Sequence, residues 1–468
     1  MKTKKSTFAL YFGNRGFFPA TLLKDARSEM GTALNKLGHK TLMLDANATR
    51  NGAVETVKEG KIFADFLQKN KGLFDGVILC LPNFGDETGA VAALKEAGVP
   101  ILIQAYPDEL DKMRPALRRD AFCGKFSIMD MFCQNNIPFT ALKPHTVHPN
   151  DKKFAANIDF FDRICSVANG MKKLVVGAIG ARTTAFKTVR IDELALQKHG
   201  ITMETLDLSD IFARMSSFKD TDKKIQAKAK RLEQYCSWKG VPQKAFHTSV
   251  RLGVALDSVI EEYEMDAVAI RCWLEMQQQL GISPCVLLSE MNDRGMIAAC
   301  EVDVGNAVTM YALSQASGNV ATVLDWNNNY GDEENKCILF HCGSVPQSMM
   351  TGKGKITDHA IIANAVGKGH AYGCNVGRIV PNPITFGSML TETGKLKFYL
   401  GQGRFTDDTI PEDFFGCAGV AEISNLQNLL QKIGYMGHRH HVSVAPSHVL
   451  EPVKEAFEKY LGYEVSIV

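Results

Sequence analysis

Several segments in the second half of the chain place acids and imidazoles where a mixed oxygen and nitrogen site could form. Glu301 emerges from an apolar run in ACEVDVGNAVTM, and Asp325 ends the strand-like run of ATVLDW. His341 follows the apolar run KCILF, and the adjacent His440 and His441 precede the apolar end of HHVSV. Carboxylates combined with imidazoles suit Mn²⁺ and similar divalent ions better than a metal that prefers thiolates. The residue types therefore predict a divalent metal site.

Each of these residues also has an ordinary structural interpretation. Glu301 could be an acid favoured at the N-terminus of a helix by the helix dipole. Asp325 could be a capping or turn residue before the asparagine run that follows it. Because neighbouring side chains on a strand face opposite ways, His440 and His441 need not both enter one site. Only the combination of these residues favours a metal centre.

A carboxylate pair on one metal could interconvert an aldose and a ketose. A metal chelated by O1 and O2 of an open-chain sugar stabilises an enediolate and holds the reacting carbons still. A carboxylate base then takes the proton from one carbon, and an acid–base partner completes the transfer. Glu301 and Asp325 fit both needs, as ligands and as the acid–base pair. His440 could bond a sugar hydroxyl.

The glycine-rich turns differ in what they indicate. GAIGAR at 177–182 does not have the spacing of the dinucleotide fingerprint, which argues against a dehydrogenase and favours a simple strand-to-loop turn. GNRGFFP at 13–19 presents Arg15 between two glycines at the end of the first predicted strand. An arginine there could hold an oxyanion or a polyol, or it could be a surface residue of a structural turn, and the residues favour neither.

The elements that must position these residues begin with alternating strands and helices. In doubly wound sheets of this kind, ligands collect at the carboxyl ends of the strands, and a second alternating series starts at LVVGAIGA, with a boundary near Lys173. From about Cys337 turn residues become dense and short alternating segments lie between them, which predicts a β-rich module, a small barrel. The first strands and helices are predicted at TFALYFGN, 19–37, TLMLDA, 54–71, GVILCLPN, GAVAALKEAG and VPILIQAY.

Composition excludes several classes of protein. The chain has 468 residues, which predicts two to four domains, and its 53 basic and 51 acidic residues leave a net charge of +2, without a nucleic-acid footprint. No apolar run is long enough to cross a membrane, and the first residues read as a strand and not as a signal peptide. The 12 cysteines form no CxxC pair, so we expect reduced thiols in a cytoplasmic protein.

Taken together, the segments resemble the L-fucose isomerase family and, more loosely, the L-arabinose isomerases. The matching text is RCWLEMQ at 271–277, then NDRGMIAACEVDVGNAVTM, then LDWNNNY, then HHV, in this order. CEVD followed by LDWNNNY is the specific part, whereas HHV alone is weak. The resemblance covers the whole chain in architecture, and its motifs are dense only from about 268 to 345.

The resemblance implies a fold of three domains and a site shared between subunits. We expect an N-terminal Rossmann-like α/β domain over residues 1–172, a second α/β domain with the metal carboxylates over 173–345, and a β-rich C-terminal domain with the metal histidine over 346–468. The family further implies a divalent metal, usually Mn²⁺, and a homo-oligomer whose sites are completed by a neighbouring subunit.

Carried over residue by residue, the resemblance also predicts the site. The metal ligands are Glu301, Asp325 and His441, and His341 is a candidate fourth ligand or supporting residue because the arabinose isomerases use a second histidine there. Glu301 and Asp325 are the expected catalytic residues. The substrate-binding residues that we expect are Arg15, Trp273, Gln277, Trp326 and His440.

The departures from the family concern the substrate and not the chemistry. The chain is shorter than typical fucose isomerases and its GNRGFFP start is divergent, which leaves two sugars open. A neutral sugar of the fucose or arabinose type is slightly favoured, and the alternative is a sugar with an anion at C6, such as sulfoquinovose, which one branch of the family isomerises. A third hypothesis is a sugar-binding protein with this fold that lacks catalysis, against which the Glu301, Asp325 and His441 set argues.

Overall fold

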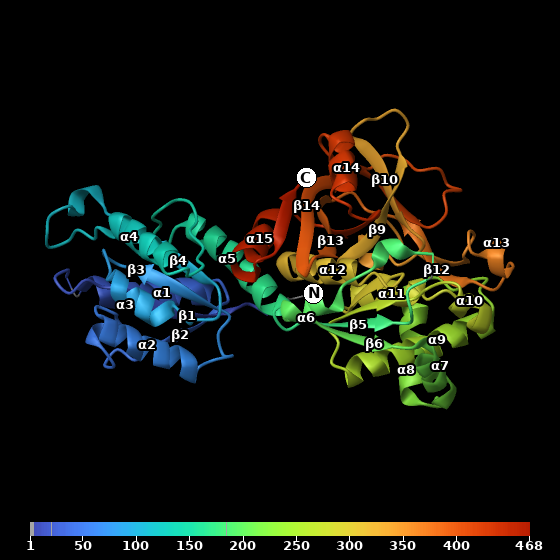
Figure 1. The fold of residues 1–468 in the computed structure, drawn as a ribbon, viewed down its shortest axis with the longest axis horizontal. Helices are drawn as coiled ribbons and strands as arrows, with labels where there is room; N and C mark the ends of the chain where they lie inside the picture. The colour runs from blue at the N-terminus through green and yellow to red at the C-terminus, as the bar shows by residue number, and fades with distance from the viewer. Residues whose placement is uncertain (1–3, 20, 184) are drawn as a thin grey trace. The chain divides into compact units, whose positions relative to one another are not determined.

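The structure is a computed structural model that describes residues 4–19, 21–183 and 185–468 (Figure 1). The chain forms two compact units, each described here by itself. The N-terminal unit consists of residues 4–169 together with Glu455–Gly462, and the C-terminal unit consists of Gly170–Lys454 together with Tyr463–Val468. The first boundary therefore lies close to the one expected at residue 172.

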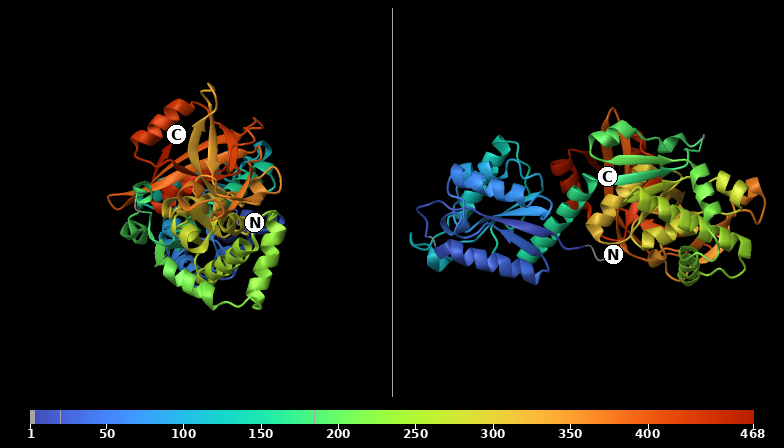
Figure 2. Two further views of the ribbon diagram at one scale, coloured as in Figure 1. Left: turned by 90° about the vertical axis from the view of Figure 1, so that its right-hand side faces the viewer. Right: turned by 90° about the horizontal axis from the view of Figure 1, so that it is seen from below.

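The N-terminal unit is built on a parallel sheet of strand order β2-β1-β3-β4 with helices on both faces (Figure 2). The central strand β3 has the sequence GVILCL and is buried along its whole length, as expected for a parallel sheet that is covered on both sides. Its elements are β1 (Thr7–Phe12), α1 (Thr21–Lys36), β2 (Lys40–Met43), α2 (Val57–Lys69), β3 (Gly76–Leu81), α3 (Glu87–Leu94), β4 (Ile101–Ala105), α4 (Ala121–Gln134) and α5 (Lys152–Met171).

The C-terminal unit opens with a second parallel sheet of the same topology, in the order β6-β5-β7-β8. The strand order reverses between β5 and β7, so loops from the carboxyl ends of these strands diverge and leave room for a ligand. The elements of this layer are β5 (Val175–Ile179), α6 (Glu193–Lys198), β6 (Thr202–Leu206), α7 (Leu208–Ser217), α8 (Lys223–Tyr235), α9 (Gln243–Glu262), β7 (Ala267–Ile270), α10 (Glu275–Leu280), α11 (Cys285–Asp293), β8 (Ile297–Cys300) and α12 (Val304–Ser317).

The rest of the C-terminal unit contains a closed β-barrel. Successive antiparallel pairings run β15-β10-β9-β16-β13-β14, and β14 pairs again with β15, which closes the ring. The barrel strands are β9 (Thr322–Asn329), β10 (Lys336–His341), β13 (Pro383–Glu392), β14 (Lys395–Phe405), β15 (Cys417–Glu422) and β16 (His441–Ala445). Around them lie β11 (Lys355–Asp358), α13 (Ala363–Val366), β12 (Tyr372–Arg378), α14 (Leu426–Tyr435), α15 (Leu450–Glu455) and β17 (Glu464–Ile467).

Helix α12 joins the parallel sheet to the barrel. It packs against β7 and β8 on one side and against β13 and β16 on the other (Figure 1). Nearly all of its side chains are buried, which agrees with a sequence rich in apolar and small residues that carries no charge. The fold thereby brings the residues that precede α12 next to the rim of the barrel.

The architecture confirms the predicted fold class, with two Rossmann-like sheets and a β-rich C-terminal part. The boundary expected at residue 345 divides a single compact unit, because β9 and β10 already belong to the barrel. All 12 cysteines are free, as expected. No helix among the described residues is long and apolar enough to span a membrane.

Candidate metal centre

Glu301 is directed into the site by an unusual turn between β8 and α12. Glu301 and Val302 both have left-handed backbone conformations, with φ of 63° and 58°, which cost energy for side chains other than glycine. Asp303 then caps α12 by accepting a hydrogen bond from the Asn306 amide at 3.0 Å. Strain of this kind is concentrated at functional sites, and here it aims one carboxylate away from the helix that follows.

The other members come from adjacent barrel strands. His441 on β16 lies directly opposite Asp325 on β9 in the antiparallel register. Phe340 on β10 lies opposite Asp325 on its other side, so His341 ends β10 at the same rim. Cross-strand pairs bring such side chains within reach of each other, although they are far apart in the sequence.

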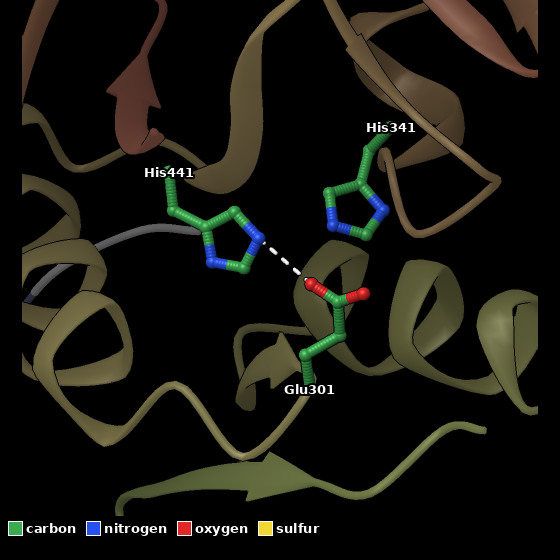
Figure 3. A group of neighbouring side chains, drawn as sticks. All are labelled: Glu301, His341 and His441. Carbon is green, nitrogen blue, oxygen red and sulfur yellow. Dashed lines mark ion pairs between the residues drawn. The ribbon is translucent and has the colours of Figure 1, made fainter. Parts of the chain in front are cut away.

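The side chains converge on one small volume (Figure 3). Nε2 of His441 lies 2.7 Å from Oε2 of Glu301 and 3.3 Å from Oδ1 of Asp325. Glu301, His341 and His441 each offer one ligand atom within 4.8 Å of the others, and so do Asp325, His440 and His441. The structure therefore brings together all of the residues that were predicted as metal ligands.

Unpaired buried atoms at this group fit a metal ion. Among the described residues, Oδ1 of Asp325 and Nε2 of His341 are buried and make no hydrogen bond, while Nε2 of His441 faces the carboxylates of Glu301 and Asp325. Buried polar atoms normally have a partner, so two such atoms beside the Glu301 carboxylate fit a site that a ligand completes. Carboxylate oxygens and an imidazole nitrogen are a donor set that divalent ions such as Mn²⁺ accept.

The charges at the centre are strongly coupled. Burial raises the pKa of Glu301, but the hydrogen bond and charge of His441 outweigh this and lower it to about 2. Burial disfavours the charged form of His441, but hydrogen bonds to Asp303 and Glu301 raise its pKa to about 10. The proton on Nε2 of His441 thus lies between carboxylates, at a position that would equally attract a cation.

Asp303 and Arg439 support the centre from behind, and the sequence analysis did not identify them. Oδ2 of Asp303 lies 2.8 Å from Nδ1 of His441, and Arg439 donates to the other oxygen of Asp303. Both residues are buried, and after the opposing effect of burial the charge of Arg439 lowers the pKa of Asp303. The carboxylate fixes the orientation of the imidazole, an arrangement common behind metal-binding histidines. In the sequence, these two residues are marked only as the second acid of EVD and the arginine of HRHH, next to predicted ligands.

Trp273 and Phe186 form a wall beside the centre. The indole N–H of Trp273 donates to Oε1 of Glu301 at 2.7 Å, so Trp273 holds this carboxylate, and its expected contact with substrate stays a prediction. The ring of Phe186 lies 5.5 Å from the ring of His440 and 5.6 Å from that of His441. Phe186 had no sequence signal, because its role depends on the loop after β5 folding over the barrel rim.

The other predicted substrate-binding residues have different positions. His440 precedes β16, so strand alternation does not turn it away, and its Nε2 lies 3.7 Å from Oδ1 of Asp325. Gln277 is buried and donates to Ser283 and to the carbonyl of Cys272, and its contact with substrate stays a prediction.

Trp326 is directed away from the centre. It follows Asp325 on β9, and alternation turns it to the opposite face of the strand. There its indole packs edge-on against Phe386 at 5.4 Å and donates to Tyr399 at 3.2 Å, in the barrel core. Its expected contact with the sugar is therefore corrected to a packing role.

Arg15 lies in the N-terminal unit, at the carboxyl end of β1. Its Nε donates to the carbonyl of Gly85 at 2.9 Å, and a terminal nitrogen pairs with Glu87. The guanidinium also lies over the ring of Phe84, 4.5 Å from its centroid. These contacts hold the Arg15 side chain within the turn, and its predicted contact with substrate stays a prediction.

Two family models match the chain. The fucose/sulfoquinovose isomerase N-terminal domain matches residues 9–172, and the L-fucose isomerase C-terminal domain matches residues 339–468. The first match covers the N-terminal unit around Arg15, and the second includes His341 and His441.

Several curated relatives carry the same name. The sulfoquinovose isomerase of Priestia aryabhattai is 21% identical over 404 residues, which are 86% of this chain and 87% of that protein. Those of Alkalicoccus urumqiensis and Clostridium sp. (strain MSTE9) are 23% and 24% identical over 61% and 58% of this chain and 63% and 60% of their own lengths. A solved glucose–galactose binding protein, GanP from Geobacillus stearothermophilus, is 14% identical over 68% of this chain and 93% of its own, with a TM-score of 0.16, too low to bear on the fold.

Proposed function

Because the chain belongs to the L-fucose isomerase family and is an aldose–ketose isomerase, we propose that it converts an open-chain aldose to its ketose with a divalent metal, Mn²⁺, at the Glu301 centre. The observation that carries this proposal is the convergence of Glu301, Asp325, His341 and His441 on one small volume, with buried atoms of Asp325 and His341 that make no hydrogen bond. A packed core gives no reason to leave such atoms unpaired.

In this proposal Glu301, Asp325 and His441 hold the metal. When bound, the metal polarises the two sugar oxygens next to the reacting carbons and so makes the C–H proton more acidic. Glu301 is ionised at neutral pH because of its low pKa, and Trp273 fixes one of its oxygens. The other oxygen is free to face the substrate once His441 is engaged.

The proton moves between C1 and C2 on the chain's own carboxylates. Glu301 takes the proton from one carbon, and Asp325, across the small site, serves as the partner that returns it or handles the oxygens. His440, half-exposed beside Asp325, is placed to bond a sugar hydroxyl. Phe186 and Trp273 exclude water from one side of the centre, which strengthens these interactions.

For the substrate we propose a sugar with an anionic group at C6, of the sulfoquinovose type. The sequence alone slightly favoured a neutral sugar, but the names of the relatives favour the anionic alternative. Two cationic residues, Arg182 and Lys187, lie on the loop that places Phe186 against the histidines. An arginine pairs well with two oxygens of a sulfonate at once. A neutral sugar of the fucose or arabinose type is the second candidate.

We also propose a homo-oligomer in which Arg15 of a neighbouring subunit contacts the distal end of the sugar. Its support is the position of Arg15 at a strand's carboxyl end, where ligands of doubly wound sheets collect, and the ordered pairing that holds its guanidinium. The mass of the native protein in solution tests the assembly.

Ketose formation from a panel of aldoses tests the proposal directly. Sulfoquinovose and L-fucose are incubated with the protein after EDTA treatment, with and without added Mn²⁺. Turnover that depends on Mn²⁺ is expected, with sulfoquinovose preferred. No turnover of any aldose together with tight sugar binding would instead support a non-catalytic binding protein.

The route of the hydrogen is tested in D₂O. Proton transfer through an enediol exposes the proton to exchange, so deuterium is expected at C1 or C2 of the product. Product without deuterium after many turnovers would contradict an exchangeable proton and would favour a hydride shift.

A further inference from the structure

The two buried histidines of the centre differ in their hydrogen bonds at Nδ1: one ring donates there and the other accepts. Nδ1 of His441 lies 2.8 Å from Oδ2 of Asp303. An ionised carboxylate only accepts, so this nitrogen carries a proton. Nδ1 of His341 instead accepts the backbone N–H of Cys342 at 3.0 Å, so this nitrogen presents a lone pair.

These partners determine what the second nitrogen of each ring can do. A neutral imidazole has one N–H and one lone pair, and the bond at one nitrogen sets the role of the other. With its proton at Nδ1, a neutral His441 presents a lone pair at Nε2 to a cation. With its lone pair at Nδ1, a neutral His341 carries its proton at Nε2 and has no lone pair there for a metal.

We propose that His341 is a catalytic hydrogen-bond donor to a sugar oxygen and not a ligand of the metal. This inference rests on the proposed isomerase function and deepens it by separating the roles of the two histidines. For His341 to bind a metal through Nε2, its proton would have to move to Nδ1, where it would face the Cys342 N–H. The backbone of β10 thus opposes the tautomer that a ligand needs.

The position of the donor suits the reaction. His341 is 2% exposed, and its Nε2 makes no hydrogen bond to any described residue. Figure 3 shows Nε2 of both imidazoles turned toward the carboxylate of Glu301, with His341 on the side opposite His441. A substrate oxygen that enters between them would give the buried N–H its acceptor.

A donor there would act on the charge that develops during isomerisation. Removal of the carbon-bound proton shifts negative charge to O1 and O2, and a fixed N–H in a water-poor site stabilises that charge without reorganisation. No bond to His341 forms or breaks in this role. The residue would therefore affect the rate of turnover far more than the affinity for the metal.

Measurements of Mn²⁺ binding by matched variants test whether His341 is a hydrogen-bond donor or a metal ligand. His341→Met and His441→Met replace each ring by an apolar side chain of similar length, and His341→Gln keeps an N–H donor. Calorimetric titration with MnCl₂ is expected to give His341→Met a Kd within about threefold of wild type, and His441→Met a Kd weaker by about 10- to 100-fold or more. The kcat of His341→Met should fall by about 10²- to 10³-fold, with partial rescue in His341→Gln.

A spectroscopic count of nitrogen ligands gives a readout that is independent of activity. In electron spin-echo measurements of the Mn²⁺-loaded protein with ¹⁵N-labelled histidine, the nitrogen coupling should persist in His341→Met and disappear in His441→Met. Thermal unfolding confirms that each variant is folded, and His341→Gln serves if His341→Met is not.

Two results would overturn the donor role while leaving the proposed function intact. The first is loss of Mn²⁺ binding in both His341 variants to the same extent as in His441→Met, which would make His341 a ligand. The second is a His341→Met variant with normal kcat. Failure of the wild-type protein to bind Mn²⁺ would overturn the metal site and this inference together.

Discussion

Two parallel sheets of this chain share one strand order, yet the polar groups at their carboxyl edges are paired in different ways. At the edge of the N-terminal sheet, Asn83 donates to Asn14, Asn14 donates to Glu55, and Arg15 pairs with Glu87. At the edge of the second sheet, Glu301 lies next to the barrel residues Asp325 and His341, and Oδ1 of Asp325 and Nε2 of His341 make no hydrogen bond with any described residue.

The carboxyl edges of two sheets with the same topology thus differ: the first is paired within the protein, and the second carries the candidate metal centre. Asn14 and Asn83 bridge the first strand and its neighbour, so this edge is stable without a ligand. The second edge concentrates negative charge and leaves atoms unpaired, which is costly unless a cation compensates it. The predictions that follow, from the largest expected effect to the smallest, test this contrast.

Removal of the Glu301 charge should abolish isomerisation at the edge of the second sheet. Glu301→Gln keeps the size of the side chain but removes a ligand and the base, so kcat/KM for ketose formation should fall by about 10³-fold or more. The fold should persist, as judged by circular dichroism. Glu422→Gln, a partly exposed glutamate that pairs with Arg404, is the matched control and should keep its activity. Full activity in Glu301→Gln would contradict the assignment.

Loss of Arg15 should distinguish a binding edge from a merely structural one. If Arg15 contacts a sulfonate, Arg15→Ala should lose about 10²- to 10³-fold in kcat/KM on the anionic sugar, or about 3–4 kcal/mol, and little on a neutral one. Kinetics on both sugars measure this. Small, equal effects on every sugar would show that the pairing with Glu87 is only a turn contact.

Asp303 should contribute to metal affinity without contacting the metal. Asp303→Asn removes the charge that orients His441, and a lost partner of this kind weakens metal binding by about 10- to 100-fold. Titration with Mn²⁺ measures it. Asp408→Asn, at a surface pair with Lys336, should leave the affinity unchanged, and an unaltered affinity in Asp303→Asn would show that the imidazole needs no such support.

The smallest expected effect is that of Lys125 on the free energy of unfolding of the N-terminal unit. It is buried, its only described partner is the carbonyl of His145, and burial lowers its pKa from 10.5 to about 8. The unfolded chain therefore binds more protons between these two values, so this residue makes stability rise with pH across that window.

Urea unfolding at pH 7.5 and pH 9 measures this rise in the free energy of unfolding. Wild type should gain about 1 kcal/mol relative to Lys125→Met over this interval, because part of the cost of the buried charge is relieved. An identical change with pH in wild type and Lys125→Met would show that Lys125 binds its proton equally in both states and that folding does not lower its pKa.

Much of the architecture follows from local patterns in the sequence. The alternation of apolar strands and amphipathic helices predicted both doubly wound sheets, and the density of turn residues after Cys337 predicted the β-rich part. The grouping of Glu301, Asp325, His341 and His441 was also predicted, because each ends or begins a strand-like run and their order matches a known family. The domain boundary at 345 stays a prediction, since composition suggested it, whereas strand pairing places β9 and β10 in the barrel.

What the sequence by itself determined is the set of residue types and the ends of the elements that carry them, since periodicity and turn chemistry act over a few neighbouring residues. Only the tertiary structure decided which of them meet. The antiparallel register placed Asp325 opposite His441 and turned Trp326 into the core, and the end of β10 gave His341 its backbone partner. Arg439 and Asp303 became one support although they are far apart in the sequence. Such contacts depend on packing between distant segments, which no local pattern records.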